Sequence, residues 1–135
     1  MTGRLGVAEA LAFAQAHREG EPLIYSSADP AAVAAAQTRF GRETVAAALE
    51  GFFAELAVAL AAAGTRRLVV AGGETSGAVA TALARPWFEI GPEIDPGVPA
   101  LRAAGAPLTL ALKSGNFGAE DFFAKAFRVL AGGRA

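Results

Sequence analysis

The segment that decides the fold is RRLVVAGGETSGAVATAL, residues 66–83. Its first part, residues 66–71, is short, apolar and β-branched, which is typical of a buried strand. The paired glycines Gly72 and Gly73 permit positive φ and close backbone approach, and the alanine-rich residues 78–83 favour a helix. The segment therefore predicts a strand, a glycine turn and a helix in succession.

The glycine turn has two interpretations. A helix that begins just beyond a strand directs free N–H groups and the positive end of its dipole at one spot, where a phosphate can bind. Alternatively, the turn is only structural, and Thr75 or Ser76 caps the helix. The turn has neither the Gly-Lys-Ser/Thr ending of a P-loop nor the G-x-G-x-x-G fingerprint of dinucleotide-binding folds. Both interpretations stay open on this segment alone.

Composition narrows the class of protein. The chain has 135 residues, a formal net charge of -1, no cysteine, and His17 as its one histidine. This length predicts a single domain, residues 1–135. The near-neutral charge argues against nucleic acid or an anionic membrane as a partner. Glu50 and Glu55 interrupt the most apolar run, and Glu9 interrupts the only apolar stretch near the N-terminus, so we expect a soluble, cytoplasmic protein.

The rest of the chain predicts an α/β fold with a mostly parallel sheet flanked by helices. Helices are expected at residues 5–18, 31–39 and 43–63 and from about residue 119, and further strands at 22–26 and 107–113. Residues 91–99 contain three prolines and two glycines, which predicts a loop.

A second glycine turn, residues 114–118, follows the strand at 107–113. Ligands bind outside the carboxyl ends of strands in an open parallel sheet, so two such turns at one edge favour an anionic ligand. Lys113 could contact a phosphate there, or it could simply reach solvent. Glu74 would repel a phosphate unless a divalent cation, a ribose hydroxyl or a nearby cation offsets its charge. Asp95 is interpreted as a turn former, and Glu120 and Asp121 as charges that favour a helix start.

Three segments resemble the signature segments of the C-terminal nucleotide-binding domain of four-carbon acid sugar kinases. They are VAGGETSGAV at 70–79, IGPEIDPGVP at 90–99 and LALKSGNFGAEDFF at 110–123. Residues 23–27 are similar to the family's strand that precedes them, so the resemblance covers nearly the whole chain. These kinases transfer the γ-phosphate of ATP to an acid such as 3-oxo-tetronate, threonate or erythronate.

The resemblance also implies site residues and cofactors. Gly72, Gly73, Glu74 and Thr75 match the family's principal ATP-binding loop, and Gly115 matches a second ATP contact; Ser76 belongs to the same motif and joins the candidates. ATP, with Mg²⁺ accompanying it, is the implied cofactor. No catalytic residue and no protein metal ligand is assigned.

The kinases of this family are much longer than this chain. Their N-terminal sugar-acid-binding domain, and a strand ending in a serine-containing loop at the start of the nucleotide domain, have no apparent counterpart here. Phosphoryl transfer requires a positioned acceptor, so we expect ATP or ADP binding without sugar-acid phosphorylation by the chain alone. An uncovered sheet edge would favour a separate sugar-acid-binding subunit or self-association. The alternatives are a non-catalytic interaction module and a phosphate-ligand sensor.

Overall fold

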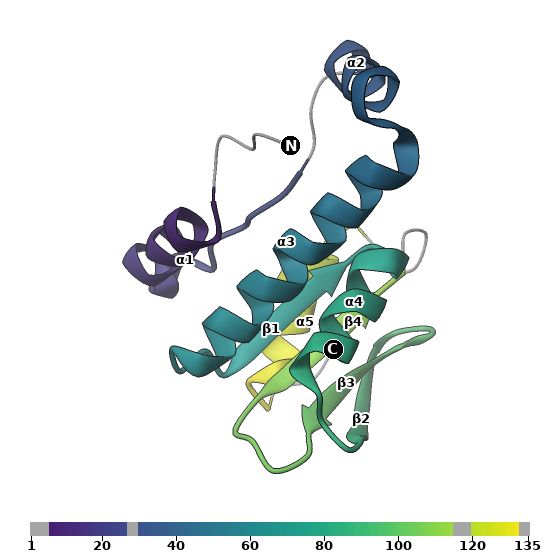
Figure 1. The fold of residues 1–135 in the computed structure, drawn as a ribbon. Helices are drawn as coiled ribbons and strands as arrows, with labels where there is room; N and C mark the ends of the chain where they lie inside the picture. The colour runs from purple at the N-terminus through teal and green to yellow at the C-terminus, as the bar shows by residue number, and fades with distance from the viewer. Residues whose placement is uncertain (1–5, 27–29, 115–119, 133–135) are drawn as a thin grey trace.

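The computed structural model describes residues 6–26, 30–114 and 120–132 (Figure 1). Helices occur at all the positions that the sequence predicts, and the strands expected at 66–71 and 107–113 are present. The elements in chain order are α1 (Val7–Ala16), the short 3-10 helix η1 (Arg18–Gly20), α2 (Pro30–Phe40), α3 (Arg42–Ala62), β1 (Arg67–Ala71), α4 (Gly73–Leu83), β2 (Phe88–Asp95), β3 (Val98–Ala103), β4 (Thr109–Lys113) and α5 (Phe122–Leu130).

The four strands form one sheet in the order β1-β4-β3-β2. β1 and β4 are parallel, with Val69 opposite Ala111, whereas β3 pairs antiparallel with both β4 and β2. The α/β class is therefore confirmed. The sheet itself is mixed, because the parallel pairing that the sequence predicts holds for β1 and β4 but a hairpin supplies the other two strands.

That hairpin corrects the expected loop at residues 91–99. β2 and β3 run through this region, and only Pro96 and Gly97 separate them; Gly97 has φ 83°. Pro92 is tolerated because β2 is an edge strand, and Pro96 lies in the turn. Pro99 of β3 stands opposite Glu93 where the register shifts, outside the residues of β3 that pair with β4. High proline and glycine content here marks an irregular hairpin and not an absence of strands.

The strand expected at residues 22–26 is a second correction. These residues belong to no helix or strand, and within the described chain no backbone–backbone hydrogen bond joins them to another segment. Leu23 and Tyr25 are exposed, at 57% and 68%. The β-branched and aromatic composition is that of a strand, but no strand among the described residues pairs with the segment.

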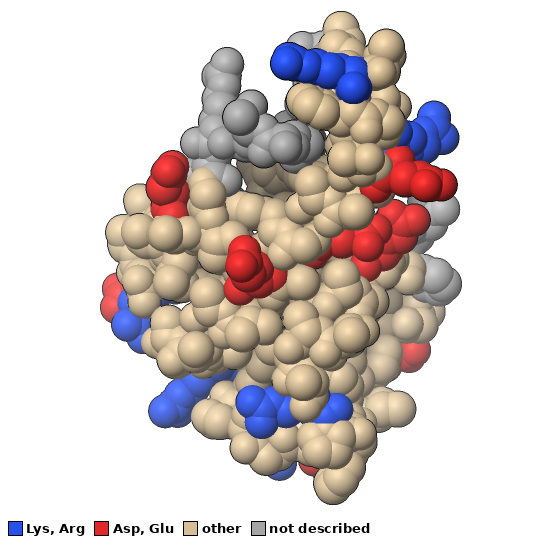
Figure 2. All heavy atoms as spheres, in the orientation of Figure 1, with Lys and Arg blue, Asp and Glu red and all other residues tan. Residues whose placement is uncertain are grey.

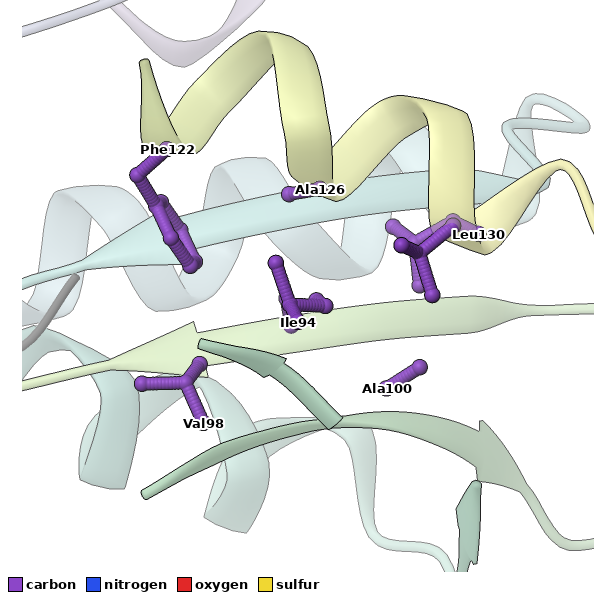
Figure 3. Packing of buried hydrophobic residues seen from close by; sticks show 8 residues of the cluster. Ile94, Val98, Ala100, Phe122, Ala126 and Leu130 are labelled. Carbon is purple, nitrogen blue, oxygen red and sulfur yellow. The ribbon is translucent and has the colours of Figure 1, made fainter. Parts of the chain in front are cut away.

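Different helices cover the two faces of the sheet. On one face, Phe122, Ala126 and Leu130 of α5 pack against Ile94, Val98 and Ala100 of the hairpin (Figure 3). On the other face, residues of α3 and α4, among them Ala57, Val79 and Leu83, pack against Val70 and Leu110. Alternate residues of β1 and β4 thus supply two separate cores, as the period of a strand requires.

α3 is long and weakly covered. Its 21 residues have a mean hydropathy of 1.8 over an 18-residue window, of which 11% is buried, so by length and composition alone this helix could cross a membrane. That is weak support for a membrane role, because core helices of domains meet the same criteria; α3 packs against α4 and buries Leu56 and Ala57. The face drawn in Figure 2 is mostly uncharged, with acidic side chains across its middle.

Candidate functional site

The β1–α4 junction forms the centre of the candidate site. Gly72 is the N-cap of α4, with φ 108° and ψ 127°, and no side chain caps this helix. The Ser76 N–H donates to the Gly72 carbonyl at 2.8 Å, which is the first hydrogen bond within the helix and leaves the N–H groups before it uncapped. The alternative interpretation, in which Thr75 or Ser76 caps α4, is therefore wrong, because Gly72 occupies the N-cap position and both residues lie inside the helix.

The junction is joined to the end of β4. The Gly72 N–H donates to the Lys113 carbonyl at 2.7 Å, and the Ser76 hydroxyl donates to the same carbonyl at 3.5 Å. Ser76 is buried, with 7% of its surface exposed. These bonds hold the start of α4 beside the carboxyl end of β4, so the two strand ends share one edge as the sequence predicts.

Gly73 lies beside Ser114 at the end of β4. A Cβ built on Gly73 would lie 3.9 Å from the Ser114 hydroxyl, the nearest heavy atom among the described residues beyond its own turn of helix. Gly73, Glu74 and Ser114 are exposed, and Thr75 is half-buried. The first turn of α4 is thus accessible to a ligand, with the Ser114 hydroxyl at its border. Gly115, predicted as a second ATP contact, lies outside the described residues.

The charges at this edge have opposite signs. The Lys113 ammonium donates to the Ser114 carbonyl at 3.3 Å and lies 5.9 Å from the centre of the Phe122 ring. Glu74 stands in the first turn of α4. The cation at the end of β4 favours anionic groups on a ligand. The carboxylate at the helix start favours a bound cation or hydroxyl groups on the same ligand.

The β2–β3 turn reaches the same edge. Leu101 pairs with Leu110 in an antiparallel register, so the start of β3 lies beside the carboxyl end of β4. Asp95, 8% exposed at the end of β2, forms an ion pair with Lys125 of α5. The hydrogen bond to Asp95 raises the pKa of Lys125 above its ordinary value, burial opposes this, and the charges of Asp95 and Asp121 add to the increase.

The sequence does not indicate a role for Lys125. Its partner lies 30 residues away, and no local pattern indicates such a pair. All three signature segments nevertheless meet at one edge of the sheet, because β1, β4 and the hairpin turn all end there.

Two cavities lie away from this junction. The larger, about 810 Å³, lies at the amino ends of β1 and β4, beside Arg66, Arg102 and Trp87. The second, about 740 Å³, lies between residues 21–24 and β1. Neither is lined by residues 72–76. Among the described residues, no group of three or more histidine or acidic side chains is placed to hold a metal ion.

The model of the nucleotide-binding C-terminal domain family matches residues 3–123. The chain therefore belongs to this family of nucleotide-binding domains. Comparison with curated proteins shows which members of the family the chain is similar to.

Those relatives are bacterial 3-oxo-tetronate kinases. The chain is 52% identical to the enzyme of Pseudomonas fluorescens over 134 residues, which are 98% of the chain and 31% of the relative. It is 56% identical to the enzyme of Brucella melitensis over 108 residues, 80% of the chain and 25% of the relative. The chain thus spans about a third of the length of these kinases or less.

Solved structures agree with the fold. Haemophilus influenzae protein HI1011 superposes with a TM-score of 0.81 and 41% identity, over 90% of this chain and 30% of that one. A protein of Salmonella typhimurium LT2, described as a putative tRNA synthase, superposes with a TM-score of 0.73 and 43% identity, over 93% of this chain and 32% of that one.

Proposed function

We propose that the chain is the ATP-binding part of a kinase that phosphorylates a four-carbon sugar acid, of the 3-oxo-tetronate, threonate or erythronate type, and that it is inactive alone. The observation that carries the proposal is the hydrogen bond from Gly72 to the Lys113 carbonyl, which sets the exposed first turn of α4 beside the end of β4. The family match and the kinase relatives support a nucleotide as the ligand.

The residues of the junction fit a phosphate chain. Gly73 and Glu74 present backbone N–H groups at the positive end of α4, and the missing Cβ of Gly73 lets a phosphate approach the backbone. Lys113 supplies a positive charge, and the Ser114 hydroxyl can donate a hydrogen bond. Thr75 completes the set of first-turn contacts, whereas the hydroxyl of Ser76 stabilises the junction through the Lys113 carbonyl.

Mg²⁺ would arrive with the nucleotide. The described residues offer no cluster of ligands for a free ion, so the phosphates would supply most of the coordination. Mg²⁺ would neutralise phosphate charge, and Glu74 would then face a less anionic ligand.

Acceptor binding is assigned to the part of the kinases that this chain does not span. Neither of the two cavities described above is lined by residues 72–76, and positioning of the acceptor is needed for transfer. We propose that the complete enzyme acts in carbohydrate metabolism in the cytoplasm. The sugar-acid-binding part of the kinase would then be the binding partner of this chain.

Calorimetric titration with Mg-ATP tests the proposal, with Gly73→Ala and Gly77→Ala as a matched pair. Neither added methyl group meets an atom closer than 3.9 Å, so both variants should fold. Gly73→Ala is expected to weaken nucleotide binding at least about tenfold because its Cβ occupies the phosphate approach, and Gly77→Ala should bind as the parent does. The absence of binding at millimolar nucleotide, or equal effects of the two substitutions, would contradict it. Sugar-acid phosphorylation by the purified chain would contradict its predicted inactivity.

A further inference from the structure

We propose that the cavity at the amino ends of β1 and β4 binds a small phosphate monoester with a flat apolar body. The cavity of about 810 Å³ lies within the range of about 300–1,000 Å³ that is typical of small-molecule sites. The proposed nucleotide site lies at the carboxyl ends of the same strands. Each strand has five residues, so about 16 Å of sheet separates the two sites, and neither proposal depends on the other.

A row of four polar residues crosses the sheet at this cavity. Arg67 of β1 and Arg102 of β3 each stand opposite Thr109 of β4. Glu89 of β2 in turn stands opposite Arg102, and all four residues line the cavity. Residues that stand opposite each other point to the same face of a sheet. This is the face that α5 covers, because Ala111, two residues beyond Thr109, packs in the core beneath that helix.

α5 ends before it covers this row. Its last residue, Leu130, and the following Ala131 line the cavity. The β3–β4 turn, residues 104–107, forms another part of the wall. The Ala104 N–H donates to the Trp87 carbonyl at 3.1 Å, which fastens this turn to the start of β2. The cavity is therefore a preformed hollow between the end of a helix and a fixed turn.

The charges of the cavity favour an anion. Three arginines line it, Arg66, Arg67 and Arg102, together with one carboxylate, that of Glu89. Arg102 and Glu89 form an ion pair at 3.8 Å with both side chains 69% exposed, and exposed pairs of this kind contribute little to stability. Arg66 and Arg67, which also border the second cavity, form no ion pair with another described residue. Their guanidinium groups are available for a ligand.

The spacing of two of these arginines favours a phosphate. Arg67 and Arg102 lie two strand spacings apart, about 10 Å between their Cα atoms, with the short, neutral Thr109 between them. A carboxylate has two oxygens and is matched by the planar fork of one guanidinium. A phosphate monoester has three terminal oxygens and up to about two negative charges. It can therefore accept hydrogen bonds from both arginines at once.

Trp87 supplies a surface for the rest of the ligand. It is the one tryptophan of the chain, it lines the cavity, and it is 68% exposed. Aromatic rings pack favourably against other flat rings in offset or edge-on arrangements. The Trp87 indole therefore favours a phosphate ester with an aromatic or similarly flat body over a bare inorganic ion.

Fluorescence of Trp87 tests the proposal directly, because no other tryptophan contributes to the signal. The probe is phenyl phosphate, with inorganic phosphate and phenol as its separate halves, and excitation at the red edge of indole absorption avoids the probes. We expect phenyl phosphate to bind with a dissociation constant of about 1 mM or below, and each half at least about tenfold more weakly. The absence of a saturable change, or equal affinity for phenyl phosphate and either half, would overturn the proposal.

Two arginine substitutions remove the same charge at different places. Arg67→Gln acts inside the cavity, whereas Arg42→Gln acts at the start of α3, outside it. The first should weaken phenyl phosphate binding at least about tenfold, and the second less than about twofold. Equal effects would mean that net charge alone governs binding, which would overturn the assignment to the cavity.

Glu89→Gln gives a result that misfolding cannot imitate. Glu89 carries the only carboxylate among the described residues that line the cavity, so its neutralisation releases Arg102 and should strengthen phenyl phosphate binding several-fold. Gly73→Ala, at the other end of the strands, should leave the response of Trp87 to phenyl phosphate unchanged. Unchanged or weaker binding by Glu89→Gln would overturn the proposal, as would loss of the Trp87 response in Gly73→Ala.

Discussion

Asp95, at the end of β2, forms an ion pair with Lys125 in the middle of α5, and both side chains are largely buried, at 8% and 18% exposed. The pair fastens the β2–β3 turn to the helix that follows β4. Since the turn lies at the same edge as Gly72 and Lys113, the pair fixes one border of the candidate nucleotide site.

Asp95→Asn should lower the melting temperature by several degrees, because it leaves a largely buried ammonium without its counter-charge. The double variant Asp95→Leu/Lys125→Met removes both charges and should recover much of the loss. Thermal unfolding followed by circular dichroism measures both. Equal melting temperatures for the parent and Asp95→Asn would mean that the pair adds nothing to stability.

The same pair predicts a dependence on alkaline pH. The folded-state pKa of Lys125 lies above its ordinary value of 10.5, so its contribution to stability is fully present below that value and is lost as pH rises through the raised pKa. The difference in melting temperature between the parent and Asp95→Asn should therefore stay constant from neutral pH and shrink only above about pH 10.5. A difference that shrinks already between neutral pH and pH 10.5 would contradict this assignment.

Sequence patterns located the elements that depend on local chemistry. β1, α4 and β4 were predicted because an apolar run, a glycine turn and an alanine-rich helix each specify their structure within a few residues. The shared edge of Gly72 and Lys113 followed from the rule that parallel strands end together.

Features that depend on distant partners were missed. Proline and glycine content predicts a loop at residues 91–99 of the hairpin, because it does not reveal a register shift. Residues 22–26 have a strand's composition, but pairing requires a neighbour that composition cannot supply. The bond between Asp95 and Lys125 joins residues on different elements, so neither residue carries a local signal of it.

Gly72→Ala should destabilise the domain by about 1–3 kcal/mol, because its φ of 108° is strained for any residue with a Cβ. Gly77→Ala, within α4 and with no atom within 4 Å of the added methyl group, should instead stabilise it by about 0.5–1 kcal/mol. Urea unfolding of the two variants measures the contrast. The same sign for both substitutions would rule out backbone strain at Gly72 as the cause.

Phe122→Ala should cost about 3–5 kcal/mol, a large part of the stability of a small domain, because Phe122 is 2% exposed and fills the core between α5 and the hairpin. Phe123→Ala is the control. The Phe123 side chain is 41% exposed, and its ring packs edge-on against the Phe122 ring with 6.0 Å between the ring centres. Its loss should therefore cost less than about 1 kcal/mol. Chemical denaturation measures the free energy of unfolding of both variants. Similar losses in the two variants would contradict the packing of α5.

Glu74→Gln tests how the site tolerates a carboxylate beside phosphates. Glu74 is exposed in the first turn of α4, where its charge would repel an unneutralised triphosphate and be offset when Mg²⁺ is bound. The substitution should therefore strengthen binding of ATP in EDTA several-fold and change binding of Mg-ATP much less. Titration of both variants with and without Mg²⁺ measures the difference. If the carboxylate coordinates the ion directly, Glu74→Gln would instead weaken Mg-ATP binding and leave metal-free ATP unaffected, which would contradict a purely repulsive role for Glu74.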